Sequence, residues 1–392
     1  MMAENKNIPE IRFAGFIDPW EQRKLADVLS SYTDPVEIPH TGYERLGIRS
    51  HAKGTFHSYV PAGHELQTAQ MHKVAADKFI VNITFGWEHA VAVTDENDAG
   101  KLVSHRFPQF SLSEELDPKF LKFIILDENF RHHLWLASPG GAGRNRVLNL
   151  TEMLQYEIYI PSVSEQRQIA DVLIRLDNLI TLHQRRYDQL KNVKKSMLEK
   201  MFPRNGANVP EIRFAGFTNA WEQRKVGDCF TERVESMPDG ELISVTINDG
   251  IKKFSELGRH DNSNDDKSKY KKVCVGDIAY NSMRMWQGAS GYSPYEGIVS
   301  PAYTVLSPNS GINSKCLAYQ FKLPEIIHTF QVNSQGITSD NWNLKYPALS
   351  QIEIFVSKDE QEQAKIAKFF ENLDNLITLH QRKRGITNLR SP

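Results

Sequence analysis

Long hydrophobic runs and paired cysteines are scarce in this sequence. Its longest apolar stretch, Phe120 to Leu126, is interrupted by Lys122 and is far shorter than a membrane-spanning helix. Cys229, Cys274 and Cys316 form no Cys-x-x-Cys pair, so neither a disulfide framework nor a thiolate zinc site is indicated. The first residues also lack the basic and then apolar pattern of a signal peptide. We therefore expect a soluble, cytoplasmic protein that is not associated with a membrane.

An excess of charge of either sign is also missing. The 47 basic and 48 acidic side chains leave a formal net charge of -1, which excludes a uniformly cationic nucleic-acid binder but not local basic patches. The 392 residues, 40% of them hydrophobic, are enough for two or three domains with their own cores.

Recognisable catalytic motifs are absent as well. None of the 13 histidines belongs to a His-Glu-x-x-His pair, and the glycine-rich stretch Gly140 to Gly143 lacks the Lys-Ser/Thr of a phosphate-binding loop. The sequence contains neither an Asn-Pro-Pro-Tyr methyltransferase motif nor a paired-acid nuclease core. These absences favour a binding protein. A nuclease or methyltransferase with an unfamiliar site, and a coiled-coil adaptor that has lost DNA reading, remain as alternatives.

The sequence does contain a duplication. The run Glu10-Ile-Arg-Phe-Ala-Gly-Phe16 recurs unchanged as Glu211 to Phe217, and Leu176-Asp-Asn-Leu-Ile-Thr-Leu-His-Gln-Arg185 recurs as Leu373 to Arg382. Between these ends the similarity is weaker, although Trp87 still matches Trp286. Two copies with matched ends and divergent middles predict two domains of the same fold with different surfaces.

The repeated end of each copy has the pattern of a long helix. No proline or glycine occurs from Glu165 to Phe202, so a single helix of roughly 55–60 Å is expected. Its large side chains alternate at intervals of four and three residues, which is typical of a coiled coil. The predicted interface residues are Ile169, Leu173, Leu176, Ile180 and His183 in the first copy, and Ile366, Phe370, Leu373, Ile377 and His380 in the second. We interpret the two histidines as polar residues that fix the register.

The second helix departs from the first after Arg382, where the sequence continues as Lys383-Arg-Gly-Ile-Thr-Asn. We therefore expect a shortened C-terminal helix. The distal part of the first helix would then lack a partner, leaving Leu190, Met197 and Met201 partly exposed.

The divergent middles read as mixed α/β domains. Strands are predicted around Phe79, Ala90, Asp277 and Tyr303, from their β-branched and aromatic content. Helices are predicted over residues 119–127 and 315–330. The predicted organisation is a first domain over 1–161, a helix over 162–203, a linker over 204–210, a second domain over 211–357 and a second helix over 358–392. The two helices are expected to form an antiparallel coiled coil, with a pseudo-twofold axis relating the two copies.

Local groups of basic, amide and aromatic side chains are candidates for contacts to DNA. Arginine and asparagine can make bidentate bonds to base edges, whereas lysine mainly contacts phosphate. The candidates in the first domain are His105, Arg106, Arg144, Asn145 and Arg146, and those in the second are Lys267, Lys269, Lys271, Arg284, Trp286 and Asn341.

Taken together, these segments resemble the specificity subunit of type I restriction–modification systems over essentially the whole chain. The resemblance rests on the duplicated Glu-Ile-Arg-Phe-Ala-Gly-Phe motif with its following Trp-Glu-Gln-Arg-Lys, and on Ser164-Glu-Gln-Arg-Gln-Ile-Ala170 leading into the repeated helix. In the second middle, Gly276-Asp-Ile-Ala-Tyr-Asn281 and Gly297-Ile-Val-Ser-Pro-Ala-Tyr303 are similar to a target-recognition domain of that family.

The resemblance implies a non-catalytic DNA-recognition subunit. Each domain would read one half of a bipartite, asymmetric double-stranded DNA target, and the helices would set the gap between the halves. It further implies two modification (methyltransferase) subunits docked on the helices, and restriction subunits that translocate and cleave DNA. No cofactor is expected on this chain; S-adenosylmethionine, ATP and Mg would be bound by the partner subunits.

Overall fold

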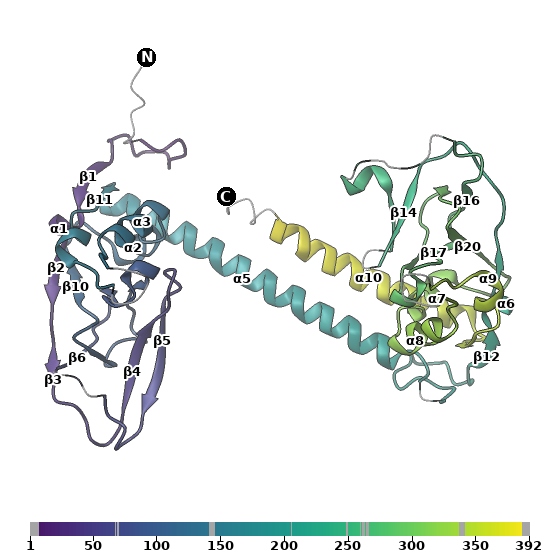
Figure 1. Ribbon diagram of the computed structural model, residues 1–392, viewed down its shortest axis with the longest axis horizontal. Helices are drawn as coiled ribbons and strands as arrows, with labels where there is room; N and C mark the ends of the chain where they lie inside the picture. The colour runs from purple at the N-terminus through teal and green to yellow at the C-terminus, as the bar shows by residue number, and fades with distance from the viewer. Residues whose placement is uncertain are drawn as a thin grey trace, which may run out of the picture. The chain divides into compact units, whose positions relative to one another are not determined.

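The computed structural model describes residues 8–385, except residues 67, 69, 141–145, 205, 248–249, 259, 261–262, 264–265 and 337–341 and the side chains of 382–385. The chain divides into two compact units, residues 1–179 and 180–392. Each unit combines strands and helices (Figure 1). The predicted mixed α/β class is therefore confirmed.

The described residues of unit 1 form three sheets. Its strands are β1 (Glu21–Lys24), β2 (Leu29–Tyr32), β3 (Pro35–Val36), β4 (Tyr43–Ile48), β5 (Thr55–Val60), β6 (Met71–Lys73), β7 (Lys78–Val81), β8 (Val91–Val93), β9 (Leu102–Ser104), β10 (Gln109–Leu112) and β11 (Glu157–Ile160). The sheet orders are β1-β11, β2-β10-β7-β8 and β3-β6-β9-β4-β5. Its helices are α1 (Leu25–Val28), the 3-10 helix η1 (Gly86–Glu88), α2 (Pro118–Ile124), α3 (Glu128–Leu136), α4 (Leu150–Met153) and the beginning of α5 (Val163–Lys200).

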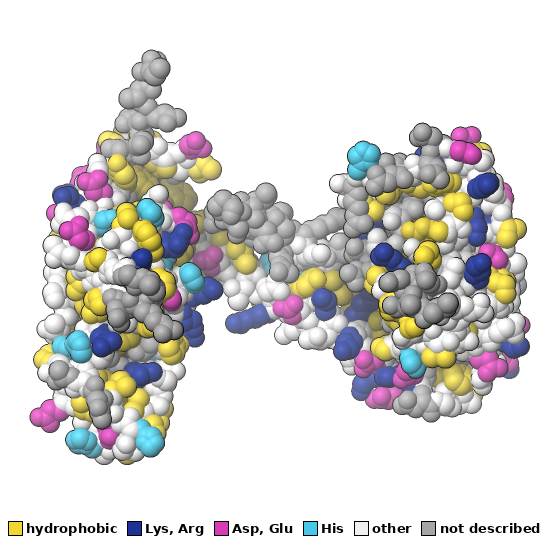
Figure 2. Space-filling model, viewed as in Figure 1, with side chains coloured by type: hydrophobic (Ala, Val, Ile, Leu, Met, Phe, Trp, Pro, Cys, Tyr) yellow, Lys and Arg dark blue, Asp and Glu magenta, His cyan; other side chains and the backbone are white. Residues whose placement is uncertain are grey.

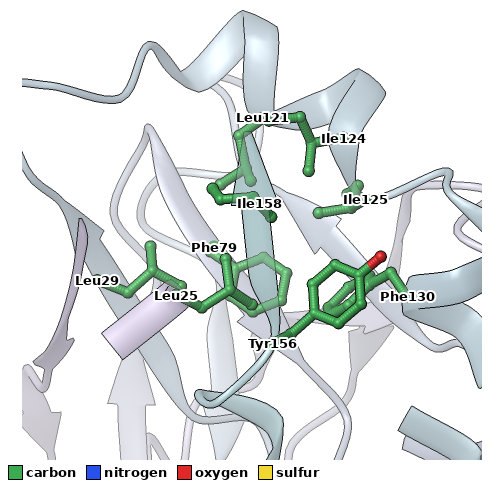
Figure 3. A pocket seen from close by; sticks show the side chains of 9 residues that line it. All are labelled: Leu25, Leu29, Phe79, Leu121, Ile124, Ile125, Phe130, Tyr156 and Ile158. Atoms are coloured by element: carbon green, nitrogen blue, oxygen red, sulfur yellow. The ribbon is translucent and has the colours of Figure 1, made fainter. Parts of the chain in front are cut away.

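The main core of unit 1 lies where α1, α2 and α3 cover the sheet that contains β7. Figure 3 shows Leu25, Phe79, Phe130 and Tyr156 converging from these elements and from the residue before β11. The rings of Phe130 and Tyr156 lie 4.9 Å apart, and the Tyr156 hydroxyl donates to Asp127 Oδ2 at 2.6 Å. Burial of these aromatic side chains is a large stabilising contribution, because each removes a wide apolar surface from water.

Unit 2 repeats part of this plan, but the strand pairs β14-β15 and β16-β19 form separate sheets in place of the five-stranded sheet of unit 1. Its strands are β12 (Glu222–Lys225), β13 (Phe230–Glu232), β14 (Ile243–Thr246), β15 (Gly250–Lys253), β16 (Lys271–Val273), β17 (Ile278–Asn281), β18 (Ser290–Tyr292), β19 (Gly297–Val299), β20 (Tyr303–Pro308) and β21 (Glu353–Val356). Its helices are α6 (Val226–Cys229), η2 (Phe254–Leu257), η3 (Met285–Gln287), α7 (Ser314–Gln320), α8 (Pro324–Val332), α9 (Tyr346–Leu349) and α10 (Glu360–Gly385). The sheet β13-β20-β17-β18 has the same strand order as β2-β10-β7-β8 of unit 1.

Most predicted elements are confirmed, and one is wrong. The four predicted strands correspond to β7, β8, β17 and β20, and the helix predicted over 119–127 corresponds to α2. The helix predicted over residues 315–330 is instead two helices, α7 and α8. Pro324 is the reason: it has no amide hydrogen to continue α7, but it fits the first turn of α8.

A buried ion pair ties each repeated motif to the start of a long helix. In unit 1, Arg12 donates to both carboxylate oxygens of Glu165 at 2.7 Å, and in unit 2 Arg213 binds Glu362 at 2.5 and 2.9 Å. Both glutamates are fully buried. Equivalent arginine and glutamate residues therefore hold the motif against the start of the long helix in both copies.

The predicted single long helix is confirmed as α5. Within unit 2, the distal part of α5 and α10 run antiparallel: Nδ1 of His183 lies 3.1 Å from Nδ1 of His380, and Lys194 Nζ lies 2.5 Å from Asp374 Oδ1. Farther along, the rings of Phe202 and Phe370 stack at 6.1 Å. The histidines thus face each other at equivalent positions, as the repeat predicted.

The burial of the predicted interface residues differs between the two copies. Ile366, Phe370 and Leu373 are buried, whereas Ile377 and His380 are half-buried. In α5, Ile169, Leu173, Ile180 and His183 are half-buried, but Leu176 is 39% exposed. The structure therefore does not bury Leu176 as predicted.

The prediction that the distal part of α5 lacks a partner is wrong. Met201 is buried, and Leu190 and Met197 pack against the same cluster, which contains Phe370 and Leu373 of α10. In an antiparallel pair, the distal end of α5 meets the beginning of α10, so the end of α10 does not determine its burial. The residues that follow Gly385 lie outside the described residues.

Candidate nucleic-acid interface

Each unit carries a tryptophan on a 3-10 helix, held by the same local contacts. In unit 1, the Asn82 side chain accepts from the amide of Thr84 at 3.0 Å, and Trp87 Nε1 donates to the Thr84 carbonyl at 3.2 Å. An asparagine that caps the following turn in this way favours a tight reversal after the strand. The result is that the indole of Trp87 is fixed at the end of β7.

The equivalent turn in unit 2 has the same geometry. The Asn281 side chain accepts from the amide of Met283 at 3.0 Å, and Trp286 Nε1 donates to the Met283 carbonyl at 3.1 Å. Trp87 is missing from the sequence-based candidates although Trp286 is among them. The match between Trp87 and Trp286 in the repeat was the signal that could have identified it.

Backbone bonds bring two further stretches beside η1. The amide of Ile83 donates to the carbonyl of Arg106 at 3.0 Å, and the amide of Leu148 donates to the carbonyl of Ile83 at 2.9 Å. The turn that carries His105 and Arg106 and the segment that carries Arg146 are therefore held next to Trp87. His105 and Arg106 are both exposed.

Unit 2 brings the same stretches together with different side chains. Leu344 donates to the carbonyl of Ser282 at 2.9 Å, and Ser282 Oγ donates to the carbonyl of Ala302 at 2.8 Å. Ala302 occupies the position that Arg106 has in unit 1. The framework is therefore shared, while the side chains it presents differ.

Arg146 lies close to two aromatic rings in unit 1. Its guanidinium carbon lies 4.8 Å from the centre of the Trp135 ring and 6.0 Å from that of Trp87. The ring of His132 stacks on Trp135 at 6.0 Å with an angle of 10°. Contact with the faces of aromatic rings restricts the motion of an arginine, and so helps to order it before a ligand binds. Trp135 and His132 were not predicted from the sequence.

The second unit replaces this stack with an aromatic pair. Trp286 packs edge-to-face on Trp342 at 5.2 Å, and Arg284 stands exposed at the beginning of η3. The displayed faces of both units carry basic, acidic and hydrophobic side chains mixed together (Figure 2). Recognition by such surfaces depends on individual side chains more than on a large positive field.

The remaining predicted candidates have other positions. Lys267, Lys269 and Lys271 lead into β16, where Lys271 Nζ lies 3.5 Å from Glu232 Oε1, and Lys269 is exposed. Arg144, Asn145 and Asn341 lie outside the described residues. None of these assignments to DNA is tested by the contacts within the chain.

In each unit, a side-chain donor joins the end of the 3-10 helix to a neighbouring helix. The donor belongs to the end of the 3-10 helix in unit 1 and to the residues after the neighbouring helix in unit 2. In unit 1, Nε2 of the buried His89 donates to the carbonyl of Ile125 at the end of α2, at 2.7 Å. In unit 2, the Lys322 ammonium, which follows α7, donates to the carbonyls of Gly288 at 2.6 Å, Ser290 at 2.7 Å and Ile247 at 3.2 Å. Burial lowers the pKa of His89, and it lowers the pKa of Lys322 to about 8.

The described residues contain neither a candidate metal site nor a candidate membrane span. No group of three or more His, Cys, Asp or Glu side chains in that part of the chain is placed to hold a metal ion. No helix there is long and apolar enough to cross a membrane.

Two curated proteins of Methanocaldococcus jannaschii are similar to part of this chain. The type I restriction enzyme MjaVIII specificity subunit is 21% identical over 206 residues, which are 50% of this chain and 48% of that protein. The putative type I restriction enzyme MjaX specificity subunit is 22% identical over 212 residues, which are 51% of this chain and 49% of that protein. The chain thus spans about half the length of each relative.

The fold has also been observed before. The crystal structure of the type I restriction–modification system S subunit from M. genitalium matches with a TM-score of 0.53 at 13% identity, covering 96% of this chain and 94% of that one. Residues 18–192 and 219–387 each match the family described as "Type I restriction modification DNA specificity domain". Since these two stretches take in most of the sequence, the chain belongs to the family of type I restriction modification DNA specificity domains.

Proposed function

We propose that this chain is the DNA sequence-specificity subunit of a type I restriction–modification complex, in which each unit reads one half of a bipartite double-stranded target. The observation that carries the proposal is the pair of equivalent turns, η1 and η3, that present different side chains from one framework. Identical readers would suit a palindrome, whereas unlike readers suit an asymmetric target.

The chemistry of each turn supports base reading. In unit 1, Arg146 is already ordered by two indoles and can donate two parallel bonds to a guanine edge. In unit 2, the exposed Arg284 at the beginning of η3 is a base-reading candidate that is close in sequence to Trp286. The exposed Lys269 is suited to a phosphate contact, which positions the domain without specifying sequence.

The exposed faces of the long helices support docking of two modification subunits. Leu179 and Leu182 of α5 are 50% and 60% exposed, and their repeat counterparts Leu376 and Leu379 of α10 are 45% and 50% exposed. Two copies of one apolar surface suit two copies of one partner. On this proposal the modification subunits bind S-adenosylmethionine, restriction subunits bind ATP and Mg, and the long helices set the gap between the half-sites.

The proposal is tested by co-expressing this chain with its modification subunit and mapping N6-methyladenine across the host genome. The expected result is a split motif with a constant gap that is absent when this chain is omitted. Methylation by the purified chain alone would contradict the proposal and favour a catalytic chain. A stable complex without any split motif would instead favour an adaptor that does not read DNA.

Arg146→Ala is expected to relax one half of that motif by about ten- to a hundredfold, because a bidentate arginine contact to guanine is lost. The other half should remain unchanged, since unit 2 reads it with its own side chains. Lys269→Ala is the control, since loss of a phosphate contact weakens binding to all sequences by a similar factor. The measurement is the same methylation map, scored at each motif position. Equal relaxation of both halves would contradict this assignment.

Leu182→Asp and Leu379→Asp are each expected to reduce the number of bound modification subunits from two to one. Each change puts a charge on one exposed docking face, which opposes burial of that face in an interface. Mass photometry of the co-expressed complexes gives the stoichiometry. The controls are Thr181→Asp and Thr378→Asp, which place the same charge on neighbouring exposed residues. Complexes that keep two modification subunits in both leucine variants would rule out this surface.

A further inference from the structure

The residue directly before η1 and the residue directly before η3 occupy equivalent places in the two units. They are Phe85 and Arg284, and each lies three residues after the repeated asparagine and two before the repeated tryptophan. Their backbone angles are nearly the same, with φ -123° and ψ 19° for Phe85 and φ -128° and ψ 13° for Arg284. One backbone conformation therefore carries an apolar ring in unit 1 and a cation in unit 2.

The same hydrogen bonds hold both residues. The amide of Phe85 donates to the carbonyl of Asn82 at 3.1 Å, and the carbonyl of Phe85 accepts from the amide of Ala90 at 3.2 Å. The two equivalent bonds of Arg284 are 2.9 and 3.2 Å long. Because the backbone is fixed in the same way, the two different side chains leave the turn in the same direction.

Both side chains lie on the outside of the turn. Gly86 is buried directly after Phe85, which is itself 45% exposed. In unit 2, Met285 is buried and Arg284 is exposed. Single exposed apolar residues are common on protein surfaces, so exposure alone assigns no role to Phe85. Its equivalence to an exposed arginine on the same framework is the informative observation.

The tip of the hairpin between β4 and β5 holds the turn of unit 1. The amide of His51 donates to the carbonyl of Glu88 at 2.9 Å, and the amide of Ala52 donates to the carbonyl of His89 at 2.8 Å. His51 and Ala52 have φ values of 62° and 48°, in the left-handed region that is costly for residues with a side chain. These bonds fix both segments, so the turn presents Phe85 from a rigid support.

The surroundings of Phe85 indicate which chemical group it can contact. The exposed Arg106 and the Arg146 beside Trp87 belong to the same group of loops, and both are suited to the polar edges of base pairs or to phosphate. An apolar ring among them cannot bond to these polar groups. In the major groove, the C5-methyl group of thymine is the one apolar group that a base pair presents, and phenylalanine is among the residues that contact it.

We propose that Phe85 is a specificity-determining residue of unit 1 and that its ring contacts the C5-methyl group of a thymine in the major groove. The equivalent Arg284 of unit 2 donates to a guanine edge instead. This inference rests on the proposed DNA-reading function and names the base that one side chain reads. The two half-sites then differ at this place because one shared backbone position carries two side chains of opposite chemistry.

Deoxyuridine provides the test, because it pairs like thymine but lacks the methyl group. The full chain in complex with its modification subunit is titrated with duplexes that carry the split motif from the methylation map, with one thymine at a time replaced by deoxyuridine. We expect one thymine whose replacement weakens binding about fourfold, the effect of burying one group of this size. Phe85→Ala should bind both duplexes equally at that place, whereas Phe85→Leu keeps an apolar side chain and should retain part of the difference.

Tyr59→Ala is the matched control, since it removes another exposed aromatic ring of unit 1 and should keep the fourfold difference. Selective binding in which no deoxyuridine effect depends on Phe85, including binding to a motif without thymine, would overturn this inference alone. A ring inserted between base pairs gives that result, because insertion does not require the methyl group. A complex that binds all sequences equally would overturn the proposed function, and this inference with it.

Discussion

Glu362→Ala is expected to destabilise unit 2 by about 3–5 kcal/mol, because it leaves a buried arginine without its counter-ion. The carboxylate of Glu362 is fully buried and accepts from Arg213, from Trp221 Nε1 at 3.1 Å and from Ser357 Oγ at 2.5 Å. Trp221 and Ser357 are buried, so loss of the carboxylate leaves their donors unpaired in the interior. The measurement is urea denaturation followed by pulse proteolysis, with the fragments assigned to the two units.

The repeat provides two graded controls for this prediction. Glu165→Ala removes the equivalent carboxylate from unit 1, where it binds Arg12 but not the indole of Trp20. We expect a smaller loss there, because fewer donors are left unpaired. Glu211→Ala breaks the exposed pair with Lys200 and should cost less than about 1 kcal/mol. A loss in Glu362→Ala no larger than that in Glu211→Ala would contradict the argument.

The matched ends of the two copies could be predicted from the sequence because identical residues make identical contacts. Arg12 and Arg213 occur in the same motif, and Glu165 and Glu362 in the same helix start, so a pair formed in one copy is expected again in the other, although the sequence alone did not pair these residues. The facing histidines on α5 and α10 follow from the heptad in the same way. The division of residues 315–330 was also readable, since Pro324 cannot continue a helix.

The candidate interface was harder to predict from the sequence, because residues that are far apart along the chain form it. Trp87, Trp135 and Arg146 are brought together by backbone bonds among loops, and no periodicity relates their positions. Arg146 was a candidate by its residue type, but the two indoles that order it could not be assigned to it. The burial of Met201 was mispredicted for a similar reason, since it depends on which part of α10 faces the distal end of α5.

The buried ammonium of Lys322 is expected to make unit 2 more stable as the pH rises from 8 toward 10. Burial lowers its pKa in the folded chain to about 8, below its ordinary value of 10.5, so in this range the unfolded chain binds more protons than the folded one. Raising the pH removes that advantage of the unfolded state. The full shift corresponds to about 3–4 kcal/mol, since each pKa unit is worth about 1.4 kcal/mol, and about 2–3 kcal/mol of it falls between pH 7.5 and 10.

Lys322→Met separates the contribution of Lys322 to the pH dependence from that of other groups that titrate in the same pH range. Burial raises the pKa of Tyr280 and Tyr319 in the same unit, so both oppose stability as the pH approaches 10 and above, in wild type and variant alike. The difference in unfolding free energy between the two proteins should therefore change by about 2–3 kcal/mol between pH 7.5 and 10. Pulse proteolysis in urea at each pH measures it for unit 2. A constant difference would show that Lys322 titrates normally.

If the proposed function holds, the same variant also affects DNA reading. Lys322 donates to the carbonyls of Gly288 and Ser290, which directly follow η3, and thereby holds the turn that carries Trp286. Methionine fills a similar volume but leaves these carbonyls without a donor, so the turn should lose its single conformation. We expect Lys322→Met to reduce the sequence selectivity at the half-site assigned to unit 2, as scored in the methylation map. The half-site read by unit 1 should remain sharp, because there His89 fastens η1 to Ile125.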